Sequence, residues 1–299
     1  MHVAVVGAGT MGTGIAHVCA AAGHEVSVRD LEPNIVMDAI DTISTRLGTS
    51  ADRGELSQRE ADAALDDLDG TTGLSSAVAG ADLVVEAIPE ELDAKRELFA
   101  DVEEHVDEDA VIATTTSSLS VSAIAAGLKD PERAVGLHFF NPPHGMALVE
   151  VALADQTSDE TAAFAEEFVE DLGKTPVVVT DSAGFASSRL ELALAVEAMR
   201  MVEQDVASVS DVDAAMELGH DHPVGPLELT DRVGLDVRLD VLEHLHDELG
   251  DRFEPPAILR EKVENGNTGK KVGRGFYVWE GGEPTDVADD EDYDIEDVI

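Results

Sequence analysis

Short apolar segments alternate with longer segments of helical spacing over roughly the first 180 residues of this 299-residue chain. The apolar segments have the length and composition of buried strands. The predicted strands cover residues 3–6, 25–29, 82–88, 110–114, 134–139, 147–151 and 176–180. Because strands that alternate with helices form βαβ units, this part is predicted to be an α/β domain with a doubly wound, mostly parallel sheet.

The pattern changes near residue 184, after which apolar positions follow helical spacing alone. The predicted helices cover residues 12–22, 33–69, 93–105 and 120–127 before this point, and 185–203, 210–218, 226–248 and 256–265 after it. One late strand is predicted at 275–279. We therefore predict an α/β domain at 1–183, a second, all-helical domain at 184–280, and a loose acidic tail at 281–299.

Charge is the most unusual global property of the sequence. The chain has 64 acidic and 19 basic residues, for a net charge of −45. Such a charge excludes nucleic acid and anionic membranes as partners. The sequence also contains no run of about 18 apolar residues, the length that a membrane span requires. The apolar periodicity argues against disorder. We expect a folded protein that needs salt to screen its acidic surface, resembling proteins of halophiles.

Cysteine and histidine usage adds three expectations. The single cysteine, Cys19, excludes an internal disulfide and fits a packed thiol in a reducing cytoplasm. The N-terminus runs directly into a strand without the features of a signal peptide, which also favours a cytoplasmic location. No metal site is predicted, because the histidine pairs are spaced i and i+2 and point apart on a helix: His220 with His222 and His244 with His246.

A glycine motif follows the first strand. Residues 7–12 read G-x-G-x-x-G, between a predicted strand and a predicted helix. This is the dinucleotide-binding context of a Rossmann domain. Gly7 provides the tight turn, Gly9 lets the backbone approach a pyrophosphate, and Gly12 allows close packing of helix on strand. The helix N-terminus, with Thr10 and Met11, offers free N–H groups to the phosphates.

An acidic residue completes the dinucleotide motif. Asp30 ends the second strand, 18 residues after Gly12. Its carboxylate is suited to accept hydrogen bonds from ribose hydroxyls and to repel a 2′-phosphate, so NAD is the predicted cofactor. The neighbouring Arg29 would instead suit NADP. Two other interpretations stay open at this point, namely a plain glycine turn with a surface aspartate, and a methyltransferase with a similar loop.

Polar residues also follow the third and fourth strands. Ser117 lies in a hydroxyl-rich segment at 114–118, at the carboxyl end of a strand, where open α/β sheets bind ligands. The alternative is that Ser117 or Ser118 caps the next helix. Glu90 and Lys95 follow the preceding strand and are placed to meet the cofactor, although residues of this kind are more often solvated surface charges.

A histidine and a glutamate lie inside two consecutive apolar strands. An isolated buried histidine is usually structural, but Glu150 within the strand at 147–151 would be expensive to bury without a partner. His138 is the nearby group that can satisfy it, if the strands pair across the turn at 142–146. Such a pair suits alcohol oxidation, because the imidazole takes the hydroxyl proton while the carboxylate fixes its tautomer.

Several longer motifs carry a resemblance to a known family. They are VVGAGTMGTGIA at 3–14, DLVVEAIPE at 82–90, TSSLS at 116–120, GLHFFNP at 136–142, LVEV at 148–151, GKTPV at 173–177, HPVGPLEL with DRVGLD across 222–236, and GKKVGRGFY at 269–277. Over roughly residues 1–280 the chain resembles the L-3-hydroxyacyl-CoA dehydrogenase family in its short, single-function form, as in 3-hydroxybutyryl-CoA dehydrogenases. The resemblance implies NAD-dependent oxidation of an L-3-hydroxyacyl-CoA, as in the β-oxidation of fatty acids.

The resemblance also implies roles for particular residues. His138 is implied as catalytic base, with Glu150 as its partner. Ser117 is implied as a substrate contact, and Asn141 as a residue near nicotinamide and substrate. Glu90 and Lys95 match cofactor-contacting positions. The helical domain is implied to form a homodimer and part of the substrate cleft.

Some positions depart from the family pattern. Ser188 stands where the family usually has an asparagine linked to substrate binding, His144 replaces a usual proline, and Thr115 replaces a common asparagine. The family's CoA site lies partly in the helical segment after the second strand, where the available cations are Arg46, Arg53 and Arg59. A related dehydrogenase of a non-CoA hydroxy or sugar acid, and a non-catalytic NAD-binding protein, stay open as alternatives.

Overall fold

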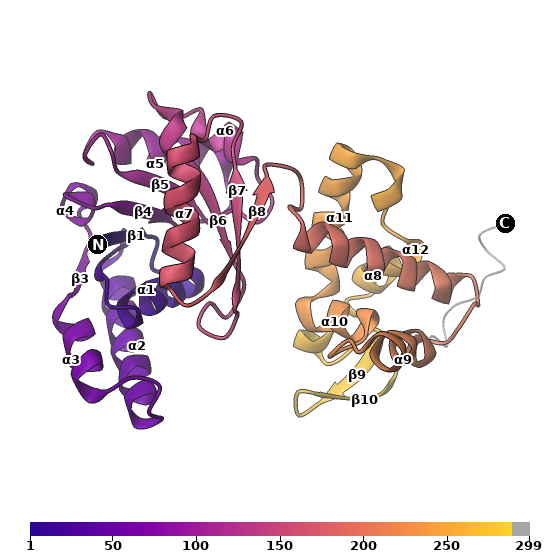
Figure 1. Ribbon diagram of the computed structural model, residues 1–299. Coiled ribbons are helices and arrows are strands. Elements are labelled where there is room, and N and C mark those ends of the chain that lie inside the picture. Colours follow the sequence, from indigo (N-terminus) through magenta and orange to yellow (C-terminus); the bar gives the residue numbers. More distant parts are fainter. Residues whose placement is uncertain (289–299) are drawn as a thin grey trace. The chain divides into compact units, whose positions relative to one another are not determined.

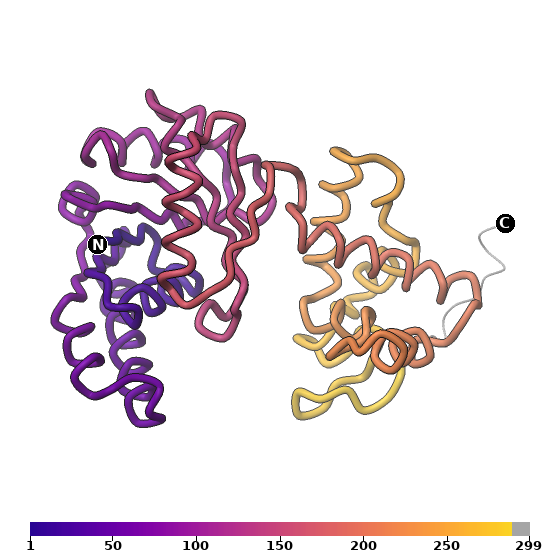
Figure 2. Tube along the Cα trace, in the orientation of Figure 1, coloured from indigo at the N-terminus to yellow at the C-terminus, as the bar shows by residue number. Residues whose placement is uncertain are grey.

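The computed structural model describes residues 1–288, and the chain divides into two compact units between Phe185 and Ala186. Figure 1 shows the first unit as a sheet covered by helices, and the second as a group of helices with one small hairpin. The Cα trace in Figure 2 follows the strands and crossovers of the first unit in chain order. The predicted combination of a doubly wound sheet with a helical second part is confirmed.

The first unit is built on one eight-stranded sheet with the order β3-β2-β1-β4-β5-β6-β7-β8. Its strands are β1 (His2–Val6), β2 (Glu25–Arg29), β3 (Leu68–Thr71), β4 (Leu83–Glu86), β5 (Val111–Thr114), β6 (Ala134–Phe139), β7 (Leu148–Leu153) and β8 (Thr175–Thr180). The first six strands run parallel to one another, whereas β7 is antiparallel to β6 and parallel to β8. The carboxyl ends of β1, β4, β5 and β6 therefore meet at one edge.

Helices cover both faces of this sheet. One face packs against α1 (Thr10–Ala21), α2 (Pro33–Asp52), α3 (Gln58–Asp66) and α7 (Asp159–Asp171), and the other against α4 (Leu74–Val78), α5 (Leu92–Glu103) and α6 (Val121–Ala125). Val3 and Val5 of β1 belong to the first core, and Ala4 and Val6 belong to the second. Because successive strand residues point to opposite faces, a continuous apolar strand supplies both cores.

The second unit contains five α-helices and a hairpin within the described residues. They are α8 (Ser187–Glu203), α9 (Val209–His220), α10 (Pro226–Val233), α11 (Leu235–Leu249), α12 (Ala257–Glu264), β9 (Tyr277–Glu280) and β10 (Glu283–Val287). Short 3₁₀ helices are η1 (Pro131–Arg133) in the first unit, and η2 (Asp251–Phe253) and η3 (Lys270–Val272) in the second.

Some predicted elements differ from the structure. The single helix predicted at 226–248 is wrong, because Gly234, with φ of +112°, separates α10 from α11. The predicted acidic tail is also wrong at its start, since Glu283–Val287 forms β10. Gly281 and Gly282 both have positive φ, which suits the two-residue turn of this hairpin. Residues 289–299 of the predicted tail lie outside the described part of the chain.

Three elements of the first unit were not predicted from the apolar pattern. The strand β3 is an edge strand with a largely exposed sequence, LDGT, so it has no apolar run. The helix α7 buries Ala165, Phe168 and Val169 at helical spacing and begins at the cap residue Ser158. The short helix α4 was also not predicted.

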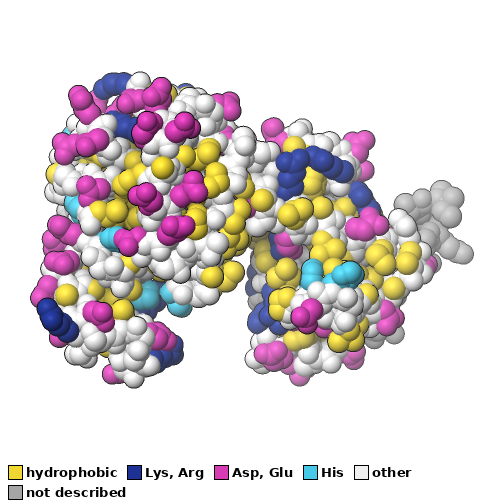
Figure 3. Space-filling view, viewed as in Figure 1, with side chains coloured by type: hydrophobic (Ala, Val, Ile, Leu, Met, Phe, Trp, Pro, Cys, Tyr) yellow, Lys and Arg dark blue, Asp and Glu magenta, His cyan; other side chains and the backbone are white. Residues whose placement is uncertain are grey.

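Acidic side chains are spread over the surface of the molecule. Figure 3 shows them across the visible face of both units, with fewer basic side chains between them. Like charges at this density repel one another and oppose compaction, and dissolved salt reduces that repulsion. None of the helices in residues 1–288 combines the length and apolarity that a membrane span requires.

A buried carboxylate anchors the hairpin of the second unit. Asp231 is fully buried and accepts hydrogen bonds from the backbone N–H groups of Phe276 (2.8 Å) and Tyr277 (2.9 Å) and from the Trp279 indole (2.9 Å). A Cβ atom at Gly275 would lie 2.0 Å from an Asp231 oxygen, so only glycine fits there. Burial raises the pKa of Asp231, although these three hydrogen bonds oppose the rise.

Replacing Asp231 with Asn is expected to lower the free energy of unfolding by about 2–3 kcal/mol, because an amide nitrogen would face buried N–H donors. Urea unfolding, followed by the fluorescence of Trp279, measures the change. Asp236→Asn is the matched control, since Asp236 pairs with Lys271 at the surface and is expected to cost less than about 1 kcal/mol. Equal losses in the two variants would contradict the anchoring role of Asp231.

Candidate active site

The glycine loop joins β1 to α1 and leaves one side open. Gly7 has φ of +108°, and a Cβ atom there would lie 2.4 Å from the carbonyl oxygen of Ala87. A Cβ at Gly12 would lie 1.8 Å from the carbonyl oxygen of Gly7, whereas at Gly9 no atom lies within 4 Å. Gly9 is also the N-cap of α1 and supplies no side-chain cap, so the first-turn N–H groups face outward for a ligand. The loop fits a pyrophosphate.

Asp30 is fixed beside this loop. Its carboxylate accepts hydrogen bonds from the backbone N–H groups of Ala8 (2.8 Å) and Leu31 (2.7 Å). The neighbouring Arg29 directs its guanidinium to the carbonyl oxygen of Thr72, at 3.3 Å. The anionic group at the end of β2 is therefore positioned for ribose hydroxyls, which fits NAD.

A buried ion pair ties the ends of β4 and β5 together. Lys95 is 1% exposed and lies 2.6 Å from a carboxylate oxygen of Glu86 and 3.2 Å from one of Glu90. Glu86, also buried, accepts a hydrogen bond from the Thr114 hydroxyl (2.7 Å). The interpretation of Lys95 as a solvated surface charge is therefore wrong.

Glu90 holds the hydroxyl-rich loop. One of its oxygens accepts hydrogen bonds from the Thr116 hydroxyl (2.5 Å) and from the backbone N–H groups of Ser117 (3.0 Å) and Ser118 (3.2 Å). Burial would raise the pKa of Glu90, but the Thr116 hydrogen bond and the Lys95 charge outweigh it and leave that pKa lowered. The helix that follows, α6, is capped by Ser120, so the capping alternative for Ser117 and Ser118 is wrong.

His138 and Glu150 are directly opposite one another. The two residues pair in the antiparallel register of β6 and β7, and the imidazole Nδ1 lies 2.8 Å from a Glu150 carboxylate oxygen. Glu150 is fully buried, and the His138 ring contacts Phe140 and Phe185 at centroid distances of 4.7 and 5.6 Å. Because Nδ1 faces the carboxylate, Nε2 is the nitrogen left for another partner.

The sheet brings most of the predicted site residues to one edge. The glycine loop, Glu90, Ser117 and the segment from His138 to Asn141 follow the carboxyl ends of β1, β4, β5 and β6, which are neighbours in the sheet. Ligands bind at this edge in open α/β sheets, and the glycine loop lies at the point where the strand order reverses. Ser188 belongs to α8 of the second unit.

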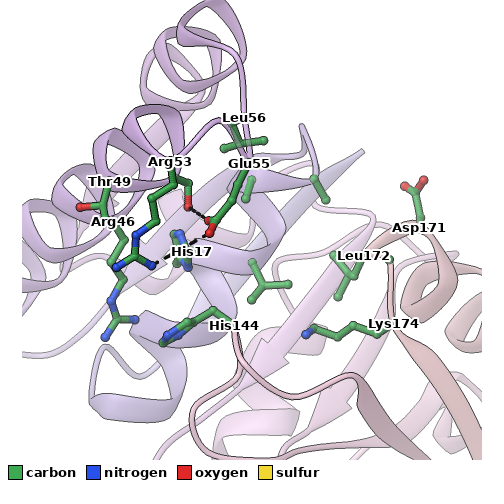
Figure 4. A pocket seen from close by; sticks show the side chains of 15 residues that line it. His17, Arg46, Thr49, Arg53, Glu55, Leu56, His144, Asp171, Leu172 and Lys174 are labelled. Carbon is green, nitrogen blue, oxygen red and sulfur yellow. Dashed lines mark hydrogen bonds and ion pairs between the residues drawn. The ribbon is translucent and has the colours of Figure 1, made fainter.

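A separate basic cavity of about 690 Å³ opens beside α1 and α2. Arg46 of α2 and Arg53, the residue that caps the end of α2, line it together with His17 of α1, whereas Arg59 is not among its lining residues. Figure 4 shows the side chains of Arg46, Arg53 and His17 close together at one side of the cavity. Two of the three arginines considered for CoA therefore converge, which the sequence left open.

Two further predictions concern Cys19 and metal binding. Cys19 is buried in the core, and burial raises its pKa to about 12, as expected of a packed thiol. Within residues 1–288, no cluster of three or more His, Cys, Asp or Glu side chains is arranged to hold a metal ion.

Comparison with known families gives two adjoining matches. Residues 2–182 match the model described as 3-hydroxyacyl-CoA dehydrogenase, NAD binding domain, and residues 184–279 match that of the C-terminal domain. The chain is 39% identical to a probable 3-hydroxybutyryl-CoA dehydrogenase of Bacillus subtilis, over 93% of this chain and 97% of that protein. It is 41% identical to a 3-hydroxybutyryl-CoA dehydrogenase of Mycobacterium tuberculosis strain H37Rv, covering 93% and 98% of the two chains.

Solved structures give the same result. The crystal structure of Mycobacterium tuberculosis FadB2 has a TM-score of 0.85 at 41% identity, over 93% of this chain and 98% of that chain. The structure of (S)-3-hydroxybutyryl-CoA dehydrogenase PaaH1 from Ralstonia eutropha has a TM-score of 0.89 at 38% identity, over 93% and 99%. The likeness thus extends through both units.

Breaking the buried Glu86–Lys95 pair is expected to be costly. Glu86→Gln leaves the Lys95 ammonium without its nearest counter-charge and should lower the free energy of unfolding by about 3–5 kcal/mol. The double variant Glu86→Gln with Lys95→Met removes both charges and should recover part of this loss. Chemical denaturation measures both, with Lys129→Met at the exposed Lys129–Glu104 pair as control. A loss for Glu86→Gln no larger than the control's would refute the role of this pair.

Proposed function

Because this chain belongs to the 3-hydroxyacyl-CoA dehydrogenase family and acts as an NAD-dependent oxidoreductase of that family, we propose that it oxidises short-chain L-3-hydroxyacyl-CoA such as 3-hydroxybutyryl-CoA. The single observation that supports the catalytic assignment is the 2.8 Å contact between His138 and Glu150, in a sheet whose β1 leads into a glycine loop that fits a dinucleotide. The four-carbon acyl group is suggested by the activity of the relatives.

The proposed reaction moves one proton and one hydride. Bound NAD⁺ supplies the hydride acceptor at its nicotinamide C4. His138 accepts the proton of the C3 hydroxyl at Nε2, while the C3–H bond breaks and the hydroxyl carbon becomes a carbonyl. Glu150 accepts the Nδ1–H hydrogen bond and stabilises the imidazolium that forms. The products are the 3-oxoacyl thioester, the reduced cofactor and a proton, which leaves through the imidazole.

Other residues are proposed to position the two ligands. The loop of Gly7, Gly9 and Gly12, with Thr10 and Met11 at the start of α1, would bind the pyrophosphate, and Asp30 the adenosine ribose. We assign Glu90 and Lys95 to the nicotinamide side of the site, with Glu90 holding the Ser117 backbone. Ser117 and Asn141 would contact substrate and cofactor. Ser188 would provide a shorter substrate contact than an asparagine.

Arg46 and Arg53 are proposed to bind phosphate groups of CoA. They line the cavity beside α2, in a chain whose net charge is −45. A concentration of guanidinium groups in so acidic a protein favours an anionic ligand, and arginine suits phosphate geometry. This cavity supports a CoA thioester over a free hydroxy or sugar acid, which carries no phosphate. Acetoacetyl-CoA with NADH is therefore the primary assay, and turnover of free acetoacetate alone would refute the proposal.

The second unit is proposed to form a homodimer. It exposes large apolar side chains at Leu190, Leu218, Val237 and Val272. Exposed apolar groups of this size are often covered by a partner subunit. A cytoplasmic location is proposed from the single, buried Cys19, because a free thiol fits a reducing compartment.

His138→Gln is expected to reduce kcat for acetoacetyl-CoA reduction by about 10²- to 10⁴-fold, because the general base is lost. Binding of NADH, measured by its fluorescence, should be unchanged. Glu150→Gln should also lose rate, since the imidazole loses the carboxylate that orients it. The control is His105→Gln, an exposed histidine at the end of α5. A His138→Gln rate within threefold of wild type would show that His138 is not the base.

The melting temperature is expected to rise with KCl concentration, because salt screens the repulsion among 64 acidic residues. The Debye length falls from about 10 Å at 0.1 M to about 3 Å at 1 M, so most of the gain should occur over this interval. Calorimetry across a KCl series, with sucrose at matched osmolality as control, measures it. A flat profile would contradict the proposed adaptation to a salt-rich cytoplasm.

A further inference from the structure

We infer that His17 and His144 are specificity-determining residues of the basic cavity, where both hydrogen-bond a phosphate oxygen of the CoA nucleotide and His17 makes its binding dependent on pH. This inference rests on the proposed function, because it adds two hydrogen-bonding residues and the uptake of one proton to the cavity assigned to CoA. His17 comes from α1, and His144 from the loop between β6 and β7.

The His17 side chain is the observation that points to a ligand. It is 6% exposed, and neither ring nitrogen has a hydrogen-bond partner in the structure. Buried polar groups are almost always hydrogen-bonded, so an unpaired imidazole in the wall of a cavity indicates a group that binds there. Figure 4 shows the His17 ring among the side chains of Arg46, Arg53 and Glu55.

A second imidazole lies beside the first. The rings of His17 and His144 are 5.9 Å apart between centroids and nearly perpendicular, at 77°. Both line the same cavity as the hydroxyl-bearing residues Thr49 and Ser50. Two imidazole donors next to two guanidinium groups form a set that suits the several oxygens of a phosphate.

The charges around His17 come from every element that packs against the cavity. Arg46 comes from α2, and Arg53 and Glu55 come from the segment directly after it. His144 comes from the β6–β7 loop, Asp171 from the end of α7, and Lys174 from the segment after α7. Glu55 is paired with Arg53 at 4.0 Å, and Lys174 donates to the carbonyl oxygens of Pro143 and Met146. Three cations and two imidazoles thus face two carboxylates, so the cavity favours an anion.

The surroundings keep His17 neutral until an anion arrives. Burial lowers the pKa of His17 to about 4, and Arg46 and His144 act in the same direction, while Glu55 opposes them. At pH 7 the ring is therefore uncharged and able to donate one N–H. A bound phosphate favours the protonated ring and raises its pKa, so binding takes up a proton.

The expected size of this effect follows from linkage. If the bound phosphate returns the pKa of His17 from about 4 to its ordinary value near 6.5, protonation strengthens binding roughly fourfold at pH 6 and hardly at all at pH 8. The titration of the phosphate itself is common to all protein variants and cancels when they are compared.

The test measures binding of CoA and of adenosine 3′,5′-bisphosphate by calorimetry at pH 6 and pH 8, in one fixed KCl concentration. Wild type should bind both probes with about a fourfold larger pH 6 to pH 8 affinity ratio than His17→Gln, whose amide donates a hydrogen bond but does not titrate in this range. His144→Ala, at an exposed position, should weaken the binding of both probes about fivefold at both pH values, because one hydrogen-bond donor to the phosphate is lost. Glu108→Gln, an exposed residue outside the cavity, is the control and should leave the ratio unchanged.

Acetoacetyl-CoA turnover separates the two proposals. Equal pH ratios in wild type and His17→Gln, or unchanged affinity in His144→Ala, would overturn the histidine assignment, even if acetoacetyl-CoA is reduced normally. A pH ratio that depends on His17, together with weaker binding in His144→Ala, supports the assignment, even if turnover fails and the proposed function is wrong. If His17→Gln does not fold, His17→Asn, whose amide also does not titrate in this range, takes its place with the same expected ratio.

Discussion

A carboxylate taken out of water must be given hydrogen-bond donors or a counter-charge, and this constraint organises the interior of the protein. Glu150 is satisfied by His138, Glu86 by Lys95, and Asp231 by three N–H groups around the hairpin. Leaving any of them unpaired in a low-dielectric interior costs several kcal/mol. Each acid therefore fixes the geometry of its neighbours. In the first unit, the Glu150–His138 and Glu86–Lys95 pairs both belong to the part of the sheet where the cofactor is expected to bind.

The same residue types act differently at the surface. The acidic groups there are solvated, so each one contributes little alone, and their summed repulsion sets the dependence on salt. In contrast to this acidic surface, the cavity lined by Arg46 and Arg53 brings positive charges together. A phosphate-bearing ligand would be repelled by most of the acidic surface and attracted by these guanidinium groups, which is the physical basis for the proposed role of the cavity in substrate selection.

The local sequence was sufficient to predict strands that are buried on both faces, and to predict site residues where a polar side chain interrupts an apolar run. The central strands were predictable because both of their faces are apolar, and a buried Glu150 needed a partner, for which His138 was the nearby candidate. The edge strand β3 has no apolar run and could not be predicted in this way. The hairpin of the second unit could have been predicted from the consecutive glycines 281 and 282, which suit a two-residue turn. Lys95 lies in a charged helical segment that looks solvated, and its burial depends on Glu86, nine residues earlier, which only tertiary packing reveals.

Two elements connect the dinucleotide loop with the basic cavity. The helix α1 begins at the glycine loop and carries His17 two turns later, so both ends of this helix contact proposed ligand sites. The β6–β7 loop begins beside His138 and carries His144. Lys174 holds this loop through two carbonyl oxygens, and a Cβ at Gly14 would lie 2.8 Å from the Pro143 ring, so α1 and the loop are in close contact. A shift of α1 would therefore move the glycine loop and His17 together, and a shift of the β6–β7 loop would move the residues after His138 together with His144, which would couple the proposed CoA cavity to the proposed cofactor and catalytic residues.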